Sequence, residues 1–229
     1  IDKVSVYPDP EYIELKTSIS NYCNCSIDNI LLGSGATELI SSFIETINPK
    51  KSLLLSPAYS EYEKELSKIG CNITKYFSKK ECDFIIDVDT LIETINKDNY
   101  ELIVICNPNN PTGFTFTKNE VEKILNSTNS FVMVDETYIE FTNMSIYSST
   151  SLVDKYKNLF VIRGTSKFFS TPGIRLGYGL ISNNKIKVKL LDKNQGISGA
   201  TNEAASLASG DYILLMDNDD ELAHSALHE

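Results

Sequence analysis

Residues that can bind anions or carry a buried charge follow several apolar segments of this chain. Gly33-Ser34-Gly35-Ala36-Thr37 leads directly into a helical pattern. Free N–H groups at a helix N-terminus bind anions, and small side chains let a phosphate approach. Asp135 ends an apolar run, where an unpaired carboxylate is costly and needs a cationic partner. Lys167 follows another apolar run, and Arg175 lies eight residues further on.

The segment Asn107-Pro108-Asn109-Asn110-Pro111-Thr112-Gly113 is more specific than these. Two prolines and two adjacent asparagines indicate an irregular, stiff backbone that exposes amide side chains. A plain turn does not need that much stiffness. The segment therefore predicts a binding loop.

Alternating strand and helix patterns predict an α/β fold that positions these residues. Strands are expected at 27–32, 52–56, 71–77, 101–106, 131–136, 158–164 and 175–182. Helices are expected at 36–47, 60–70, 118–126 and from a cap at Asp89 to Asn96. The short connections favour a largely parallel sheet. Ligands of such sheets bind outside the carboxyl ends of the strands, where the residues above gather.

Several classes of chemistry are excluded by composition. The only histidines, His224 and His228, lie at the extreme C-terminus, so the body of the chain has no Ser-His or Cys-His nucleophile system and no histidine metal site. The five cysteines form no CxxC pair and indicate free thiols in a reducing cytoplasm. A net charge of −10 argues against a nucleic-acid partner, and no apolar run is long enough to cross a membrane. The chain lacks an initiator Met, which indicates a fragment or a trimmed chain.

Five motifs carry a resemblance to a known family. They are GSGATELI, PAYSEY, NPNNPTG, VDETYIEF and SKFFSTPGIRLGY, in this order. Residues 4–182 resemble the fold-type I pyridoxal 5'-phosphate (PLP) enzymes. They are most similar to histidinol-phosphate aminotransferases and the related threonine-phosphate decarboxylases. The resemblance implies a PLP-transferase-like large domain, incomplete here over residues 1–182, with a mostly parallel sheet flanked by helices.

The resemblance also implies roles for individual residues around the cofactor ring. Lys167 would hold PLP covalently and then move a proton at the substrate Cα. Asp135 would pair with the protonated ring nitrogen. Asn110 and Tyr138 would hydrogen-bond the phenolic oxygen of the ring. Tyr59 would stack on the ring face, although a role as a core aromatic stays open.

A second set of residues is implied for the phosphate of PLP. The backbone of Ala36 and Thr37 would bind it together with the side chains of Ser166 and Arg175; helix capping stays open for Thr37 and Ser166. Tyr7 resembles a tyrosine that reaches the phosphate of the neighbouring subunit, which would imply a homodimer with shared sites.

Two features depart from the family pattern. Gly164 stands where many relatives carry a Ser or Thr that touches the phosphate. Arg163 and Arg175 are the only arginines. Arg163 is assigned to structure or salt bridging. Relatives bring a further arginine from a C-terminal small domain to bind the substrate carboxylate, and the small domain expected after residue 182 is not recognisable.

The function implied is amino-group transfer between an L-amino acid or amino-alcohol phosphate and a 2-oxo acid. A PLP-dependent decarboxylase of the threonine-phosphate type fits the same motifs, so both alternatives stay open. A third alternative is that the chain is a remnant that only binds the cofactor, or an inactive composite.

The C-terminal residues show a different resemblance. Beyond a junction at 183–193, residues 194–229 resemble a fragment of a family-2 glycosyltransferase of GT-A fold, through a glycine- and asparagine-containing segment and the run DYILLMD. Asp217 and Asp219 then occupy the position of a DxD motif, which would bind a divalent metal and a nucleotide sugar. A solvated acidic turn is the favoured interpretation of these aspartates, because so short a fragment rarely builds its own core.

Overall fold

A computed structural model describes residues 9–182 of the 229-residue chain. The helices are α1 (Ile13–Cys23), α2 (Ala36–Ile47), α3 (Ser60–Lys68), α4 (Val88–Asn96), α5 (Lys118–Ser127) and α6 (Met144–Tyr147). The strands are β1 (Ile30–Gly33), β2 (Lys51–Ser56), β3 (Asn72–Phe77), β4 (Leu102–Cys106), β5 (Phe131–Asp135), β6 (Leu159–Gly164) and β7 (Gly177–Ile181). Tyr7, the junction at 183–193 and the fragment at 194–229 with Asp217 and Asp219 lie outside the described residues.

The strands form one seven-stranded sheet in the order β1-β7-β6-β5-β4-β2-β3. The pairs β2–β3, β2–β4, β4–β5 and β5–β6 are parallel, whereas β7 runs antiparallel to both β1 and β6. The expected α/β class with a mostly parallel sheet is therefore confirmed. The carboxyl ends of the parallel strands meet at one edge of the sheet, which is where the motif residues follow them.

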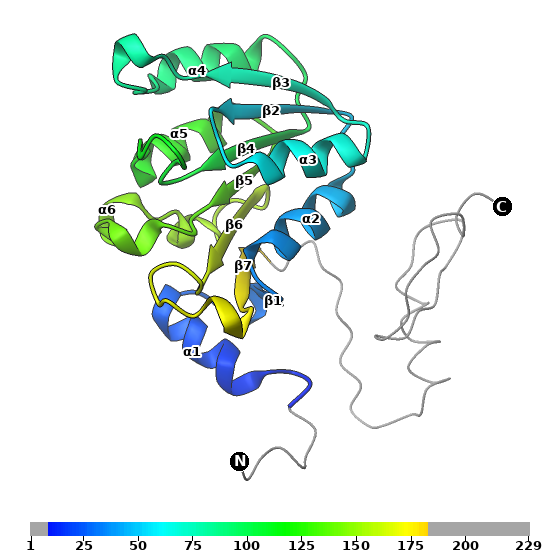
Figure 1. The fold of residues 1–229 in the computed structure, drawn as a ribbon, viewed down its shortest axis with the longest axis vertical. Coiled ribbons are helices and arrows are strands. Elements are labelled where there is room, and N and C mark those ends of the chain that lie inside the picture. The colour runs from blue at the N-terminus through cyan, green and yellow to red at the C-terminus, as the bar shows by residue number, and fades with distance from the viewer. Residues whose placement is uncertain (1–8, 183–229) are drawn as a thin grey trace, which may run out of the picture. The chain divides into compact units, whose positions relative to one another are not determined.

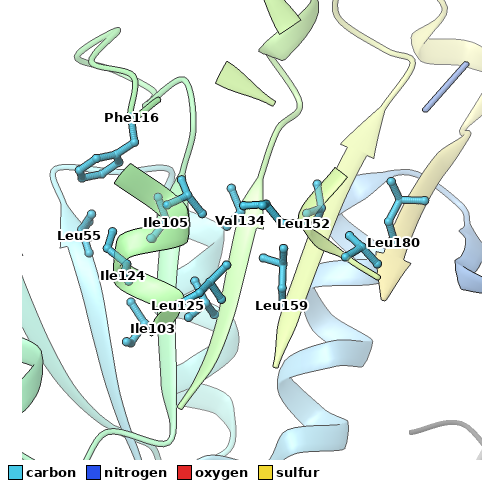
Figure 2. Packing of buried hydrophobic residues seen from close by; sticks show 14 of the residues in the cluster. Leu55, Ile103, Ile105, Phe116, Ile124, Leu125, Val134, Leu152, Leu159 and Leu180 are labelled. Atoms are coloured by element: carbon cyan, nitrogen blue, oxygen red, sulfur yellow. The ribbon is translucent and has the colours of Figure 1, made fainter. Parts of the chain in front are cut away.

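Helices cover both faces of the sheet. In Figure 1, α2 and α3 lie along one face, and α4 and α5 lie along the other. On the first face, Ile40, Ile44 and Leu66 pack against Leu54, Val104 and other strand residues. On the second face, the buried side chains come from β2, β4, β5, β6 and β7, from the helices and from connecting turns; Figure 2 labels Leu55, Ile103, Ile105, Phe116, Ile124, Leu125, Val134, Leu152, Leu159 and Leu180. Burial of this kind on both faces explains why β4, β5 and β6 read as continuous apolar runs.

The predicted elements are confirmed with corrections at their ends. The strand expected at 27–32 begins only at Ile30, because Ile27–Asn29 forms a 3₁₀ turn capped by Ser26, whose hydroxyl accepts from the Asp28 N–H. The N-cap of α4 is Asp87, whose Oδ1 accepts a 2.8 Å hydrogen bond from the Thr90 N–H, and not Asp89. β7 begins at Gly177 rather than at 175, because Arg175 has a left-handed backbone with φ 55°. Helix α1 was not predicted. It buries little apolar surface, since only Ile19 and Cys23 are buried, and its N-cap, Tyr12, makes no side-chain cap bond. Asp9 supplies the bond instead, and its Oδ2 accepts from the Ile13 N–H at 2.8 Å.

Across residues 9–182, none of the helices has the length and apolar character needed to cross a membrane.

Candidate cofactor site

A cavity of about 290 Å³ opens at the carboxyl ends of the parallel strands. It brings together every predicted cofactor-binding residue in the described part of the chain: Ala36, Thr37, Tyr59, Asn110, Asp135, Tyr138, Ser166, Lys167 and Arg175. Their convergence from five separate motifs is the geometry that the resemblance implies; their roles stay predictions. A larger, more open groove of about 660 Å³, lined by Asn99, Glu101, Asn129 and neighbours, contains none of the motif residues.

The N-terminus of α2 forms one end of the cavity. Its N-cap, Gly35, has φ 100° and no side chain, so the first N–H groups of the helix have no side-chain partner there. Arg175 lies against this turn, and its Nη2 donates a 3.3 Å hydrogen bond to the Ser34 carbonyl. A Cβ at Gly35 would lie 2.6 Å from that guanidinium nitrogen. The glycine therefore lets the arginine approach a helix N-terminus, where both favour an anion.

At this end of the cavity, Gly177 packs closely against the start of α2. A Cβ at Gly177 would lie 2.4 Å from the carbonyl carbon of Gly35 and 2.5 Å from the Ala36 nitrogen. The first residue of β7 thus packs directly against the backbone at the start of α2. This contact sets the position of the helix N-terminus relative to the sheet.

Asp135 forms a second wall of the cavity and is 5% exposed. Its Oδ2 accepts a 2.6 Å hydrogen bond from the Tyr62 hydroxyl. Its Oδ1 accepts bonds from the Thr137 N–H (2.9 Å) and the Thr137 hydroxyl (2.5 Å). All three donors are neutral, and Asp135 makes no salt bridge with any residue in 9–182. The expected cationic partner is therefore not supplied by the described residues, and the charge faces the cavity.

Lys167 is exposed on the loop after β6, and its Nζ lies 5.8 Å from the centroid of the Tyr138 ring. The loop is fastened by bonds from Thr165 N–H to the Leu176 carbonyl (3.2 Å) and from the Thr171 hydroxyl to the Thr165 carbonyl (3.0 Å). These bonds hold both ends of the loop that carries Lys167, and the Lys167 side chain lines the cavity.

The asparagine-rich loop separates into structural and cavity-lining residues. The buried side chain of Asn107 accepts from the Phe116 N–H (2.7 Å) and donates to the Phe116 carbonyl (3.0 Å). Asn109 donates to the Pro57 carbonyl at 2.9 Å. Asn110 lines the cavity. The first two asparagines therefore fold the loop, and the third is available to a ligand.

Tyr59 also lines the cavity. Its ring is 38% exposed and contacts the Tyr62 ring edge-on, at 5.7 Å between centroids and 87° between planes. The alternative that Tyr59 is a core aromatic does not fit this exposure.

Three lining residues with polar or ionisable side chains, Tyr62, Thr137 and Cys106, were not predicted from sequence. Signals were present for all of them: Tyr62 lies one helical turn after Tyr59, Thr137 lies two residues after Asp135, and Cys106 ends β4 directly opposite Asp135 in the strand register. Burial raises the pKa of the Cys106 thiol to about 12 and raises the pKa of the Tyr62 hydroxyl well above its ordinary value. Both groups therefore stay neutral beside the carboxylate.

Arg163 has the structural role that was predicted for it. Its Nε and Nη2 donate to Oε2 of Glu136 at 3.1 and 2.9 Å, and Nη2 also donates to the Ser148 hydroxyl at 2.7 Å. The Arg163 and Glu136 side chains are 2% and 0% exposed. Burial opposes the guanidinium charge, but the Glu136 carboxylate outweighs it and raises the pKa of Arg163. The pair lies beneath the site and does not line its cavity.

Comparison with known proteins places the chain among enzymes with this architecture. It is 37% identical over 188 residues to a putative threonine-phosphate decarboxylase of Caldanaerobacter subterraneus subsp. tengcongensis, covering 80% of this chain and 51% of that protein. It is 35% identical over 185 residues to a histidinol-phosphate aminotransferase of Methanococcus aeolicus, covering 80% and 49%. The crystal structure of the histidinol-phosphate aminotransferase from Clostridium acetobutylicum superposes with a TM-score of 0.70 at 35% identity, covering 80% and 54%.

The chain thus spans about half the length of the curated relatives that it matches. The profile described as "Aminotransferase class I and II" matches residues 1–221. That match runs across the region assigned to a junction and into the glycosyltransferase-like fragment, so the boundary at residue 182 stays a prediction. Since the profile spans nearly the whole chain, the chain belongs to the class I and II aminotransferase family.

Proposed function

We propose that the protein is a PLP-dependent aminotransferase of the histidinol-phosphate type. Its reaction transfers an amino group between an L-amino acid or amino-alcohol phosphate and a 2-oxo acid. One observation carries the proposal. A buried carboxylate with only neutral donors, Asp135, faces the same cavity as the free amine of Lys167 and the N-terminus of α2.

The residues of this cavity fit PLP at both of its charged ends. Asp135 is available to the cationic ring nitrogen, because none of the residues 9–182 neutralises it. The N–H groups of Ala36 and Thr37, with Ser166 and Arg175, are available to the phosphate. When bound, PLP supplies an electron sink that stabilises negative charge at the substrate Cα.

The remaining residues orient the ring and move a proton. Tyr59, Asn110 and Tyr138 line the cavity. Tyr59 would stack on the cofactor ring, and Asn110 and Tyr138 would offer an amide and a hydroxyl to the phenolic oxygen. The amine of Lys167 would take the proton from the substrate Cα and return it to the product. Two hydrogen bonds at the ends of its loop support this role, because they fix the backbone that carries the amine.

A decarboxylase of the threonine-phosphate type is the second candidate. The 37% identity to a putative threonine-phosphate decarboxylase supports it, and the same cofactor residues serve both reactions. The two differ in which substrate bond breaks, so the products separate them. An aminotransferase yields a new amino acid from the 2-oxo acid, whereas a decarboxylase releases CO₂.

We further propose that the protein acts as a homodimer. An aromatic ridge supports this: Tyr22, Phe169, Phe168 and Phe141 are 43–64% exposed and linked by ring contacts at 5.3–6.2 Å. The ridge continues to Tyr138 at the cavity, with centroids 6.4 Å apart. Exposed aromatic surface of this kind indicates a protein interface, here beside the site. The five free cysteines support a reducing compartment, the cytoplasm.

Binding of PLP to the 229-residue chain tests the proposal. The wild-type chain is mixed with PLP, its visible absorption is recorded, and borohydride reduction is followed by peptide mapping. We expect a visible band and an adduct on Lys167. Lys167→Ala should lose both, and Lys157→Ala, which removes another exposed lysine, should keep both.

An adduct scattered over surface lysines would contradict the proposal. Where the band forms, incubation with histidinol phosphate and a 2-oxo acid, and separately with threonine phosphate, distinguishes amino transfer from CO₂ release.

A further inference from the structure

Both oxygens of the Asp135 carboxylate are held by side chains or backbone of the protein. Tyr62 donates to Oδ2 at 2.6 Å, and Thr137 donates twice to Oδ1, at 2.9 and 2.5 Å. Thr137 belongs to the same strand end as Asp135. Tyr62 comes from α3, which is 73 residues away in sequence. The Tyr62 bond therefore ties the carboxylate to a different element of the fold.

Tyr62 is held rigidly enough to set the orientation of its partner. The side chain is fully buried, in the apolar cluster between α2, α3 and the sheet that also contains Ile40, Leu66 and Cys106. Its ring packs edge-on against Tyr59. Tyr59 is the N-cap of α3 and Tyr62 lies in its first turn, so both residues line the cavity, Tyr59 as an exposed side chain and Tyr62 as a buried one.

The ionisable side chains packed beside Asp135 add no second negative charge. The Cys106 thiol and the Tyr62 hydroxyl are the ionisable groups packed beside Asp135, and burial keeps both protonated. Tyr62 thus acts as a hydrogen-bond donor and brings no charge of its own. A hydrogen bond to a charged group is stronger than one between neutral groups. Its loss in a buried site leaves the carboxylate short of one hydrogen-bond donor, which costs free energy.

We infer that Tyr62 is a positioning residue, whose hydroxyl holds the Asp135 carboxylate in the orientation that pairs with the ring nitrogen of PLP. The inference rests on the proposed PLP function and gives a role to Tyr62, for which the resemblance implied none. Tyr62 does not touch the reacting atoms. It acts only through Asp135.

Tyr62→Phe tests this, because the variant keeps the buried ring and removes only the hydroxyl. We expect the dissociation constant for PLP to rise about ten-fold, as befits one lost hydrogen bond to a charged group. Without this donor the carboxylate competes more strongly for the ring proton. The ¹⁵N NMR signal of bound ¹⁵N-labelled PLP should therefore shift towards that of a neutral ring nitrogen.

Tyr156→Phe is the matched control. It also removes a tyrosine hydroxyl that is hydrogen-bonded to a carboxylate, at 3.1 Å from Glu122, and to Asn126 at 2.8 Å. It lines none of the site, so PLP affinity and the ¹⁵N signal should not change. Thermal melts of both variants check that they fold.

Repeating Tyr62→Phe in an Asp135→Asn background shows whether Tyr62 acts through the carboxylate. The ten-fold effect should then fall below about two-fold, because the charge it stabilises is absent. An equal effect in both backgrounds, or an unchanged affinity and ¹⁵N signal in the single variant, would overturn the inference while leaving the proposed function intact. Failure of the wild-type chain to bind PLP would overturn both.

Discussion

Replacing Gly177 by alanine probes the contact between β7 and α2. Gly177 pairs with Gly33 of β1 and Gly164 of β6. A Cβ there would lie 2.4 Å from the Gly35 carbonyl carbon and 2.5 Å from the Ala36 nitrogen. Both are backbone atoms, which cannot rotate away as a side chain does. The start of α2 must therefore move relative to the sheet.

We expect Gly177→Ala to lower the free energy of unfolding by an amount at the upper end of the range for overpacked interiors. Inserting one methyl group into a packed interior costs about 1–3 kcal/mol, and an immovable backbone neighbour favours about 3 kcal/mol. For a domain of this size each kcal/mol lowers Tm by about 2–4 °C, so we expect a fall of roughly 6–12 °C. Moving the Ala36 N–H should also weaken binding of PLP, through its phosphate.

Thermal denaturation followed by circular dichroism, together with PLP titration, measures both effects. Gly173→Ala is the neutral control, since no atom lies within 4 Å of its Cβ position. Gly179→Ala is the second control: its Cβ would meet the Phe160 ring at 2.5 Å, and not the backbone at the start of α2. It should lower Tm without a specific loss of PLP affinity. A Tm for Gly177→Ala within about 2 °C of wild type would refute the packing argument.

Two further predictions follow from the same region and from the buried ion pair. Gly164→Ser should fold normally, because its Cβ would lie at an ordinary contact distance of 3.5 Å from the Ala36 Cβ. The added hydroxyl should tighten PLP binding several-fold in a titration, since it can donate one hydrogen bond to the phosphate. Weaker binding would show that the hydroxyl does not reach the phosphate. Arg163→Met should lower the free energy of unfolding by about 3–5 kcal/mol in urea, because Glu136 loses its buried cation. The surface pair of Lys64 with Glu61 is the control, and Lys64→Met should lower the free energy of unfolding far less than Arg163→Met. Equal losses for the two variants would contradict the burial argument.

The elements with strong periodicity were predictable from sequence. The apolar spacing in 36–47 marks a helix at the bounds that α2 has, and continuous apolar runs mark β4, β5 and β6. Asp87 and Asp89 are chemically equivalent as caps, and only the backbone of Asp87 is extended where the helix begins. Helix α1 has too little buried surface to leave a periodic signal.

The directions of the strands were harder to predict from sequence. The antiparallel direction of β7 could be inferred, because no helical pattern lies between β6 and β7 and parallel neighbours need a long crossover. Most motif residues of the site could be located from sequence because they lie at the end of a strand or in the loop that follows it. Tyr62 lies three residues after Tyr59, but its contact with Asp135 was not predictable, because the order β5-β4-β2 and the helix that follows β2 bring the two together.

The position of β7 has a consequence for the order in which the protein is made. β1 is synthesised early but pairs only with β7 in the sheet, and β7 is the last strand along residues 9–182. During translation, β1 and the turn that opens α2 have no sheet partner until residue 181 has left the ribosome. The end of the cavity at the start of α2, which packs against Gly177 of β7, is therefore completed late, whereas the β2–β5 core can assemble before it. A nascent chain stopped before Gly177 would expose an unpaired β1 edge and would lack this end of the cavity, where we propose that the phosphate binds.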